Sequence, residues 1–268
     1  MKPIRVVVHG ALGRMGREII NALCQEAETE VVGAVDLKAT EDYLPLPDDS
    51  GSVPLSSDLG SILASHQIDV LVDFTIAKAT MPAIRIATER KVNLVIGTTG
   101  LQTNDLDEIN RLATTHQVGA VVAPNFALGA VLMIHLAKIA AKYLDYAEII
   151  ELHHHLKADA PSGTAVSTAR AMAQAKGKPF SQPPESKKPS ISRGEQIEGV
   201  TIHSVRLPGL LAHQEIIMGA LGQTLSIRHD TIGRECYMPG VILAIKEVVH
   251  RQGLIYGLDA LLGLEEKQ

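Results

Sequence analysis

The stretch IRVVVHGALGRMG, residues 4–16, decides the fold of the first half of this chain. It opens with a short β-branched run, Ile4 to Val8, which predicts a buried strand. The glycine-containing turn that follows leads into a helix expected to run to about Gln25. A second apolar run, Glu30 to Val35, predicts the next strand and ends at Asp36. These elements form a β-α-β unit, the building block of a doubly wound parallel sheet.

The turn between the first strand and the helix is suited to a dinucleotide. Gly10 allows the tight turn, Gly13 lets the backbone approach a pyrophosphate, and Gly16 lets the helix pack close to the strand. The helix amino terminus then faces the phosphates. Leu12 occupies the place of the usual second glycine, so the pattern reads G-x-x-G-x-x-G. Its position between a strand and a helix, with Asp36 at the expected distance, predicts nucleotide binding.

The choice between NADH and NADPH stays open in the sequence. Asp36 can accept hydrogen bonds from a free ribose hydroxyl, which favours NADH. Lys38 and Arg14 could meet a 2′-phosphate, although Lys38 is equally explained as a solvated loop residue. We therefore expect the cofactor to be NADPH or NADH.

Strands and helices continue to alternate as far as residue 126. The expected strands are Val70 to Phe74, Leu94 to Ile96 and Val118 to Ala123, with helices at Leu59 to Ser65, Ala77 to Arg90 and about Asn104 to His116. The acidic, proline-rich stretch Thr40 to Pro54 is expected to be a surface excursion. Ligands bind at the carboxyl ends of strands in such sheets. The turns Gly97 to Gly100 and Ala123 to Phe126 are therefore candidate nicotinamide contacts, although each alone also fits ordinary turn chemistry.

From Leu128 onward the pattern changes, which predicts a second, α+β domain with an open mixed sheet of about four strands. Its expected elements are a helix at about Val131 to Leu144, strands at Glu148 to Leu152, Val200 to Arg206, Gln214 to Met218 and Gln223 to His229, and a helix at Ala165 to Ala175. The polar stretch Lys176 to Gly194 is expected to be a loop or lid. A last helix, Pro239 to His250, is expected to return to the first domain. The expected division is residues 1–126 with 239–268 for dinucleotide binding, and 127–238 for substrate binding and oligomerisation.

The composition excludes several classes of function. The 268 residues carry a formal net charge of −5, so no basic surface indicates binding to nucleic acid or membrane. Aromatic residues are only 3%, with no tryptophan, which argues against base-stacking platforms. No apolar run approaches the length of a membrane span. Cys24 and Cys236 lie outside any CxxC motif and are typical of reduced thiols in a cytoplasmic protein.

The stretch ELHHHLKADAPSGTA, residues 151–165, carries the most chemistry. It lies between an expected strand and an expected helix, with Ser162 placed to act as the helix N-cap. The amides of Gly163 and Thr164 would then lie unpaired at the helix amino terminus, where they favour a carboxylate or phosphate. Lys157 adds a positive charge. Such a loop suits a small anionic substrate that needs a proton.

Two other interpretations of this stretch remain open. His153 and His155 could be metal ligands of a hydrolase or lyase, although neither a cysteine nor an HExxH pattern stands close by. The chain could also be a dinucleotide sensor without catalysis, in which case replacing His153 would not matter. Each polar residue taken singly fits a solvated loop, but polar residues this dense between two apolar elements are seldom needed for folding alone.

The chain resembles the 4-hydroxy-tetrahydrodipicolinate reductase (dihydrodipicolinate reductase) family over nearly its whole length. The resemblance rests on GALGRMG at residues 10–16, the Phe74-Thr75 strand end, GTTG at 97–100, the Asn125-Phe126 turn, and above all HHHLKADAPSGT at 153–164. The family pattern has two adjacent histidines, two variable residues, a lysine, one residue, and then Asp-Ala-Pro-Ser-Gly-Thr. Every fixed position matches.

The resemblance implies NAD(P)H-dependent reduction of 4-hydroxy-tetrahydrodipicolinate, with loss of water, in lysine and diaminopimelate biosynthesis by a homotetramer. It implies that His153 is the acid/base residue and Lys157 the second proton donor, with no metal. Asp36-Leu37-Lys38 departs from the acid-then-arginine pair often seen in the family, so contacts to NADPH stay open. The residues expected to bind substrate are His154, Ser162, Gly163 and Thr164. The residues expected to line the dinucleotide are Gly10, Ala11, Leu12, Gly13, Arg14, Met15, Asp36, Lys38, Gly97, Thr98, Thr99, Ala123, Pro124, Asn125 and Phe126.

Overall fold

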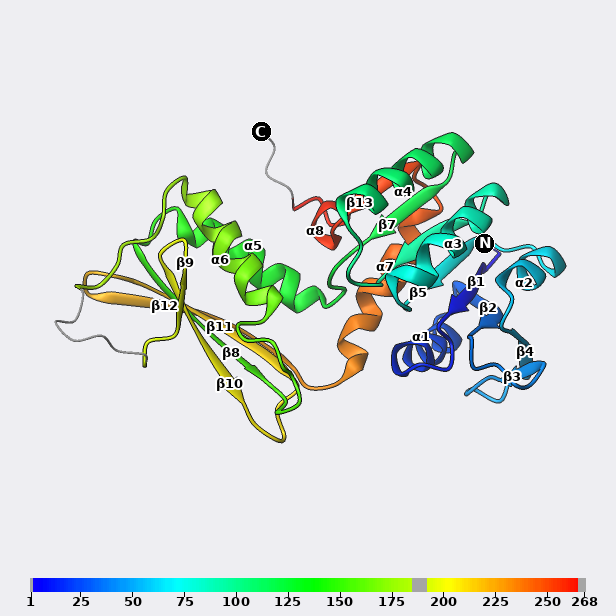
Figure 1. Cartoon of the computed structure of the whole chain (residues 1–268), viewed down its shortest axis with the longest axis horizontal. Coiled ribbons are helices and arrows are strands. Elements are labelled where there is room, and N and C mark those ends of the chain that lie inside the picture. Colours follow the sequence, from blue (N-terminus) through cyan, green and yellow to red (C-terminus); the bar gives the residue numbers. More distant parts are fainter. Residues whose placement is uncertain (1, 185–191, 265–268) are drawn as a thin grey trace. The chain divides into compact units, whose positions relative to one another are not determined.

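The computed structural model describes residues 2–184 and 192–264. The chain separates into two compact units, Met1–Leu128 together with Arg234–Gln268, and Gly129–Gly233 (Figure 1). The first unit therefore contains both ends of the chain. Among the described residues, none of the helices combines the length and hydropathy that a membrane crossing requires.

The first unit is built on an eight-stranded sheet in the order β13-β7-β6-β5-β1-β2-β4-β3. Its strands are β1 Ile4–His9, β2 Thr29–Val35, β3 Tyr43–Pro45, β4 Ser52–Ser56, β5 Val70–Asp73, β6 Asn93–Ile96, β7 Gly119–Val122 and β13 Gly253–Tyr256. All neighbours pair in parallel except β3 and β4. Strand β1 lies inside the sheet, with β2 on one side of it and β5 on the other. The expected doubly wound parallel sheet is thus confirmed.

The helices of this unit are α1 Arg14–Gln25, α2 Leu59–Ser65, α3 Ala77–Glu89, α4 Thr103–His116, α7 Met238–Val248 and α8 Leu258–Leu261, with a 3-10 turn at Arg234–Tyr237. Consecutive strand residues such as Val6, Val7 and Val8 are all fully buried. Neighbouring residues on a strand point to opposite faces, so both faces of this sheet are covered. This explains why the strands read as continuous apolar runs in the sequence.

Two parts of the first unit differ from the expectation. The stretch Thr40 to Pro54, expected to be a surface excursion, contains β3 and the start of β4, and β4 extends the sheet beside β2. Val53 and Leu55 are buried and alternate with the more exposed Ser52, Pro54 and Ser56, which is the pattern of a half-buried strand. Strand β13 was not expected either, and it pairs with β7 at the other edge of the sheet.

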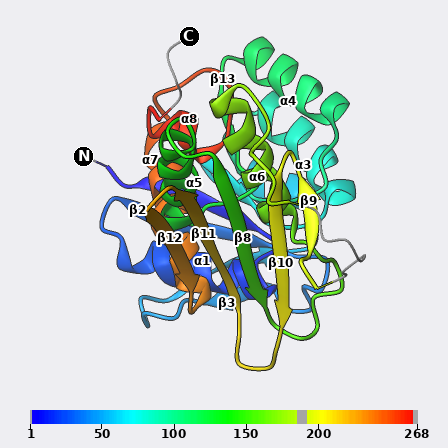
Figure 2. The same cartoon turned by 90° about the vertical axis from the view of Figure 1, so that its left-hand side faces the viewer.

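The second unit has five strands rather than about four, in the order β12-β11-β8-β10-β9 (Figure 2). They are β8 Tyr146–His153, β9 Glu195–Ile197, β10 Val200–Arg206, β11 Ala212–Ala220 and β12 Gln223–Thr231. The strand missed in the sequence is β9, which has three residues and pairs with β10. Strands β8 and β10 are parallel to each other, whereas β11 is antiparallel to both β8 and β12. Residues 185–191 of the expected polar loop lie outside the described residues.

Two helices, α5 Leu128–Ala141 and α6 Gly163–Lys176, pack on one face of this sheet. The shared core joins Met133 and Met172 of the helices to Ile149, Ile202 and Ile216 of three neighbouring strands. Residues of β8 alternate between this core face and the opposite face. Glu151 stands on the core face and is fully buried, which is unusual for a charged side chain.

Candidate active site

The first candidate site is the carboxyl end of the parallel sheet in the first unit. The amides of Gly10 and Ala11 donate to the Val35 carbonyl at 2.8 and 3.1 Å, which ties the turn after β1 to the end of β2. Gly10 has a φ of +86°, a conformation that favours glycine. A Cβ at Gly16 would lie 2.1 Å from the Gly10 carbonyl oxygen. The turn therefore has its tight form only because both positions lack a side chain, and α1 starts directly after it at Arg14.

Asp36 is held beside this turn. Its Oδ2 accepts from the Leu12 amide at 3.0 Å and its Oδ1 from the Lys38 amide at 2.9 Å. Lys38 is exposed, and it contacts Asp36 through its backbone amide. A carboxylate has about four acceptor positions, so Asp36 can still accept from ribose hydroxyls.

Replacing Asp36 by serine is expected to shift cofactor use from NADH towards NADPH. The carboxylate repels a 2′-phosphate and accepts from a free 2′-hydroxyl, and serine does neither as strongly. The ratio of kcat/KM for NADH to that for NADPH should fall by at least about 10-fold, since a hydrogen bond to a charged group is worth about 1.5–3 kcal/mol. Asp48→Ser is the control, because Asp48 also accepts from an amide two residues on but lies in a surface turn. An unchanged ratio in Asp36→Ser would contradict a role in cofactor choice.

A buried carboxylate joins the other turns at this end of the sheet. Asp73 accepts from His9 Nδ1 at 2.6 Å and from the hydroxyls of Thr98, Thr80 and Thr75 at 2.6, 2.8 and 2.9 Å. Burial by itself raises the pKa of Asp73, but the hydrogen bonds from these partners outweigh it and the pKa is lowered. The stabilisation from this charge is therefore present above the ordinary aspartate pKa and is lost as the pH falls through the lowered value.

An aromatic pair lies next to this network. The ring centroids of Phe74 and Phe126 are 5.5 Å apart, and a Cβ at Gly97 would lie 2.2 Å from the nearest atoms of the Phe74 ring. Gly97 is thus the residue that lets the ring lie against the turn after β6. The predicted cofactor residues, Gly10 to Met15, Asp36, Lys38, Gly97 to Thr99 and Ala123 to Phe126, all follow the carboxyl ends of β1, β2, β6 and β7 in one sheet.

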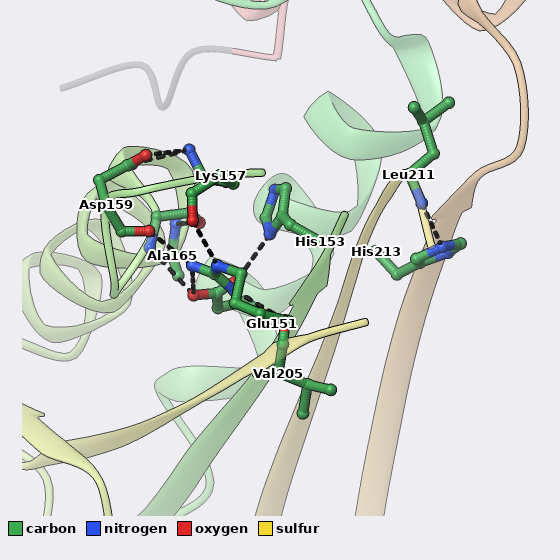
Figure 3. A network of polar contacts seen from close by, with 10 residues as sticks. Glu151, His153, Lys157, Asp159, Ala165, Val205, Leu211 and His213 are labelled. Carbon is green, nitrogen blue, oxygen red and sulfur yellow. Dashed lines mark hydrogen bonds and ion pairs between the residues drawn. The ribbon is translucent and has the colours of Figure 1, made fainter. Parts of the chain in front are cut away.

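The second candidate site lies at the end of β8 in the second unit (Figure 3). His153 is the last residue of β8, and its Nδ1 is 2.5 Å from Oε2 of Glu151. Arg206 of β10 binds the same carboxylate at both oxygens, each at 2.8 Å. Strand register places Arg206 directly beside His153. The cluster therefore joins two residues close in the sequence to one that only the sheet brings near.

Lys157 follows in the loop after β8. Its ammonium lies 2.7 Å from both carboxylate oxygens of Asp159 (Figure 3). This ion pair lowers the pKa of Asp159. The predicted substrate residue His154 lies beside this loop, and its carbonyl accepts from the Lys157 amide at 3.1 Å. His155 is exposed. Within residues 2–184 and 192–264, His, Cys, Asp and Glu side chains form no group of three arranged to hold a metal ion.

The loop ends at the amino terminus of α6. Ser162 is the N-cap, and its hydroxyl accepts from the Ala165 amide at 3.2 Å. Gly163 and Thr164 form the first helical positions and are exposed. The first amides of a helix have no partner within it and carry partial positive charge. This end of α6 can therefore receive a carboxylate.

Burial and charge set the protonation of the cluster. Burial by itself raises the pKa of Glu151, but hydrogen bonds from Arg206, Ser204 and His153 outweigh it, so the pKa is lowered and the group is ionised at neutral pH. Burial lowers the pKa of His153 below its usual value, and the hydrogen bond and charge of Glu151 act in the opposite direction. In the free protein His153 is therefore mostly neutral at pH 7 and can take up a proton near a dianionic ligand.

Two residues of the cluster, Glu151 and Arg206, were not among the predicted site residues. Glu151 stands two residues before His153, so strand periodicity alone puts both on one face. A glutamate inside an apolar strand was the available signal. Arg206 is 55 residues from Glu151 and carried no such signal.

A Rossmann-type parallel sheet with a glycine-containing turn after β1, and a separate unit that presents histidine, lysine and the first amides of a helix, define a two-domain nicotinamide-dependent oxidoreductase. Residues 4–126 match the family model described as dihydrodipicolinate reductase, N-terminus, and residues 129–262 match that for its C-terminus. The chain belongs to the dihydrodipicolinate reductase family.

Relatives of similar length support this assignment. The chain is 57% identical to a 4-hydroxy-tetrahydrodipicolinate reductase of Dehalococcoides mccartyi, over 98% of this chain and 100% of the relative. It is 49% identical to that of Moorella thermoacetica, over 97% and 98%. Among solved structures, a dipicolinate-bound dihydrodipicolinate reductase from Paenisporosarcina sp. TG-14 superimposes with a TM-score of 0.86 at 38% identity, covering 96% of this chain and 99% of that one.

Proposed function

We propose that this chain reduces 4-hydroxy-tetrahydrodipicolinate to tetrahydrodipicolinate with NADH or NADPH and with loss of water. The observation that carries the proposal is the loop from β8 to α6. It presents His153, Lys157 and the first amides of α6 within a dozen residues, in a chain whose relatives bear the name of this reductase. The reaction is a step of lysine and diaminopimelate biosynthesis.

The residues of the loop have complementary roles in this proposal. When bound, the nicotinamide would supply a hydride to the six-membered ring. His153 and Lys157 then hold and deliver the proton that the developing carbanion or enamine needs, a contribution of about 10²–10⁴-fold for a well-placed acid. Lys157 also offsets the negative charge of the substrate.

The substrate carboxylates are assigned to the other end of the loop. His154, Ser162 and the amides of Gly163 and Thr164 would hold them, because a helix amino terminus stabilises an anion. The solved relative from Paenisporosarcina binds dipicolinate, a ring with two carboxylates, which supports a small dicarboxylate substrate. Holding the dianion fixes the ring for hydride transfer.

We assign cofactor binding and substrate binding to different domains, with the boundaries expected from the sequence. Residues 1–126 with 239–268 bind the dinucleotide, and residues 127–238 bind the substrate and form the oligomer. Ile150 and Leu152 of β8 lie on the face of the sheet opposite the helix-packed core and are only partly buried. A second copy of this sheet would cover such a face, which supports a homotetramer. We place the protein in the cytoplasm because its cysteines, Cys24 and Cys236, are free thiols. Sedimentation at micromolar concentration distinguishes a tetramer from a monomer.

The purified protein is expected to oxidise NADH or NADPH only when the ring substrate is present. The substrate is generated in situ from pyruvate and aspartate semialdehyde by its synthase, and nicotinamide absorbance is followed with each cofactor in parallel. Activity should be unchanged in a chelator, whereas its loss would support the metal-dependent alternative. A protein that binds NADH but oxidises none of it with this substrate would instead be the sensor.

A further inference from the structure

We propose that Glu151 and Arg206 are positioning residues that fix the proton-carrying nitrogen of His153 and the backbone of the loop that carries Lys157. This inference rests on the proposed function, because it assigns His153 its role in proton transfer. Neither residue needs to touch the substrate. Both act through groups that do.

The orientation of His153 follows from the carboxylate beside it. Arg206 donates to both oxygens of Glu151, and the Ser162 amide adds a third hydrogen bond at 3.2 Å to Oε1. A carboxylate with these donors is ionised and can only accept. The proton between Glu151 and His153 is therefore carried by Nδ1 of the ring. The Nε2 atom is left as the nitrogen that gives a proton to the substrate and takes one from solvent.

Arg206 extends the same control to the loop. Its Nη2 donates to the Asp159 carbonyl at 2.6 Å and its Nε to the Lys157 carbonyl at 3.3 Å. The Glu151 carboxylate holds the guanidinium in place and also receives the amide at the start of α6. One ion pair, between the fully buried Glu151 and the partly buried Arg206, thus connects the histidine, the lysine loop and the helix amino terminus.

Stability alone does not account for this pair. Burying an ion pair costs desolvation, and apolar replacements of such pairs are often neutral or stabilising. The positions on the same face of β8, Ala147 and Ile149, are apolar and fully suited to the core. A charged pair at the one position next to His153 fits a requirement of the site rather than of the fold.

The chain contains a matched control on the same strand. Glu148 of β8 also binds a histidine and an arginine, His203 at 2.8 Å and Arg193. Its side chain is 41% exposed, whereas that of Glu151 is fully buried. Glu148 lies on the opposite face of the strand from Glu151. The Glu148 and Glu151 groups have the same residue types but differ in burial and in position. Comparing their variants therefore separates a positioning effect from the loss of a surface ion pair.

Glu151→Gln is expected to lower kcat by about 10²-fold, because glutamine cannot hold both Arg206 and His153 in the same arrangement. Affinity for dipicolinate and for NADH should stay within about twofold of the original value, since the groups assigned to binding remain. Removing the carboxylate also lowers the pKa of His153 further, so the fall of kcat/KM with rising pH should begin at lower pH. Glu148 lies on the same face of β8 as Ile150 and Leu152, so the oligomeric state of Glu148→Gln is first checked by sedimentation. In protein of the original oligomeric state, Glu148→Gln should change none of these quantities. Arg206→Lys keeps the charge but cannot donate to both oxygens of Glu151 at once, so it should also lower kcat.

His153→Ala separates the two proposals. Full turnover in His153→Ala would overturn the proposed role of His153 and with it this inference. Low turnover in His153→Ala, with Glu151→Gln unchanged in kcat and in pH profile, would overturn the positioning inference alone.

The unsubstituted protein gives a test that does not depend on a variant folding. ¹⁵N NMR of histidine-labelled protein, with His153→Ala to assign the signal, should show neutral His153 protonated at Nδ1. Protonation at Nε2 would overturn the inference.

Discussion

Lys157→Ala is expected to lower kcat by about 10²–10⁴-fold while the affinity for NADH is unchanged. The ammonium of Lys157 lies in the loop between His153 and the start of α6 and is held by Asp159. Alanine removes both a proton donor and the cation that offsets a dianionic substrate. Steady-state kinetics of nicotinamide oxidation measure the first effect, and a fluorescence titration with NADH measures the second.

Lys178→Ala is the matched control for this experiment. Lys178 lies in the same unit and its ammonium is 4.0 Å from a carboxylate oxygen of Asp145, but its side chain is 68% exposed and far along the chain from the loop. Its replacement should leave kcat unchanged, since exposed ion pairs contribute little. Near-normal turnover in Lys157→Ala would remove Lys157 from the proposed machinery.

Gly16→Ala is expected to weaken NADH binding by about 10-fold or more and to lower the melting temperature. A Cβ at this position would lie 2.1 Å from the Gly10 carbonyl oxygen and 2.7 Å from the Ala11 Cα. Both are backbone atoms of the turn after β1, which we propose to bind the pyrophosphate, and they cannot rotate away, so the turn itself must move. Overpacking of this kind costs about 1–3 kcal/mol. Titration with NADH and calorimetric unfolding measure the two effects.

Gly219→Ala provides the comparison. Gly219 has no atom within 4 Å of the position that a Cβ would take, and its φ is not positive. Its replacement should change neither NADH affinity nor the melting temperature appreciably. If Gly16→Ala bound NADH as tightly as the original protein, the close approach of α1 to the turn would have no bearing on the cofactor.

The fold of the first unit could be predicted because its strands are buried on both faces and its helices are amphipathic. Runs such as Val70–Asp73 are then unmistakable in the sequence. The missed strands lack that signal. Strand β3 has three residues and is stabilised by pairing with β4, and β13 contains no fully buried residue. Their existence depends on a neighbouring strand edge, which a sequence pattern does not display.

The site could be predicted in part for the same kind of reason. His153, Lys157 and Ser162 lie within one loop, so their spacing is visible in the sequence. The contact of Arg206 with Glu151 depends on the register of β8 and β10, two parallel strands separated by α6 and a long connection. Parallel register is set by packing over the whole sheet, so a sequence can supply the residues without showing which of them meet.

The first unit contains residues from both ends of the chain, and this has a consequence for its synthesis on the ribosome. Strand β7, with Val121 and Val122 buried, is an inner strand only when β13 pairs with it. Gly240 of α7 packs against the backbone of Phe126, where a Cβ would lie 2.1 Å from the carbonyl oxygen. A nascent chain that has emerged only as far as residue 128 therefore carries an open, apolar sheet edge until β13, Gly253–Tyr256, is made. Such an edge favours association with other chains, so the order of translation leaves this chain open to association during its synthesis.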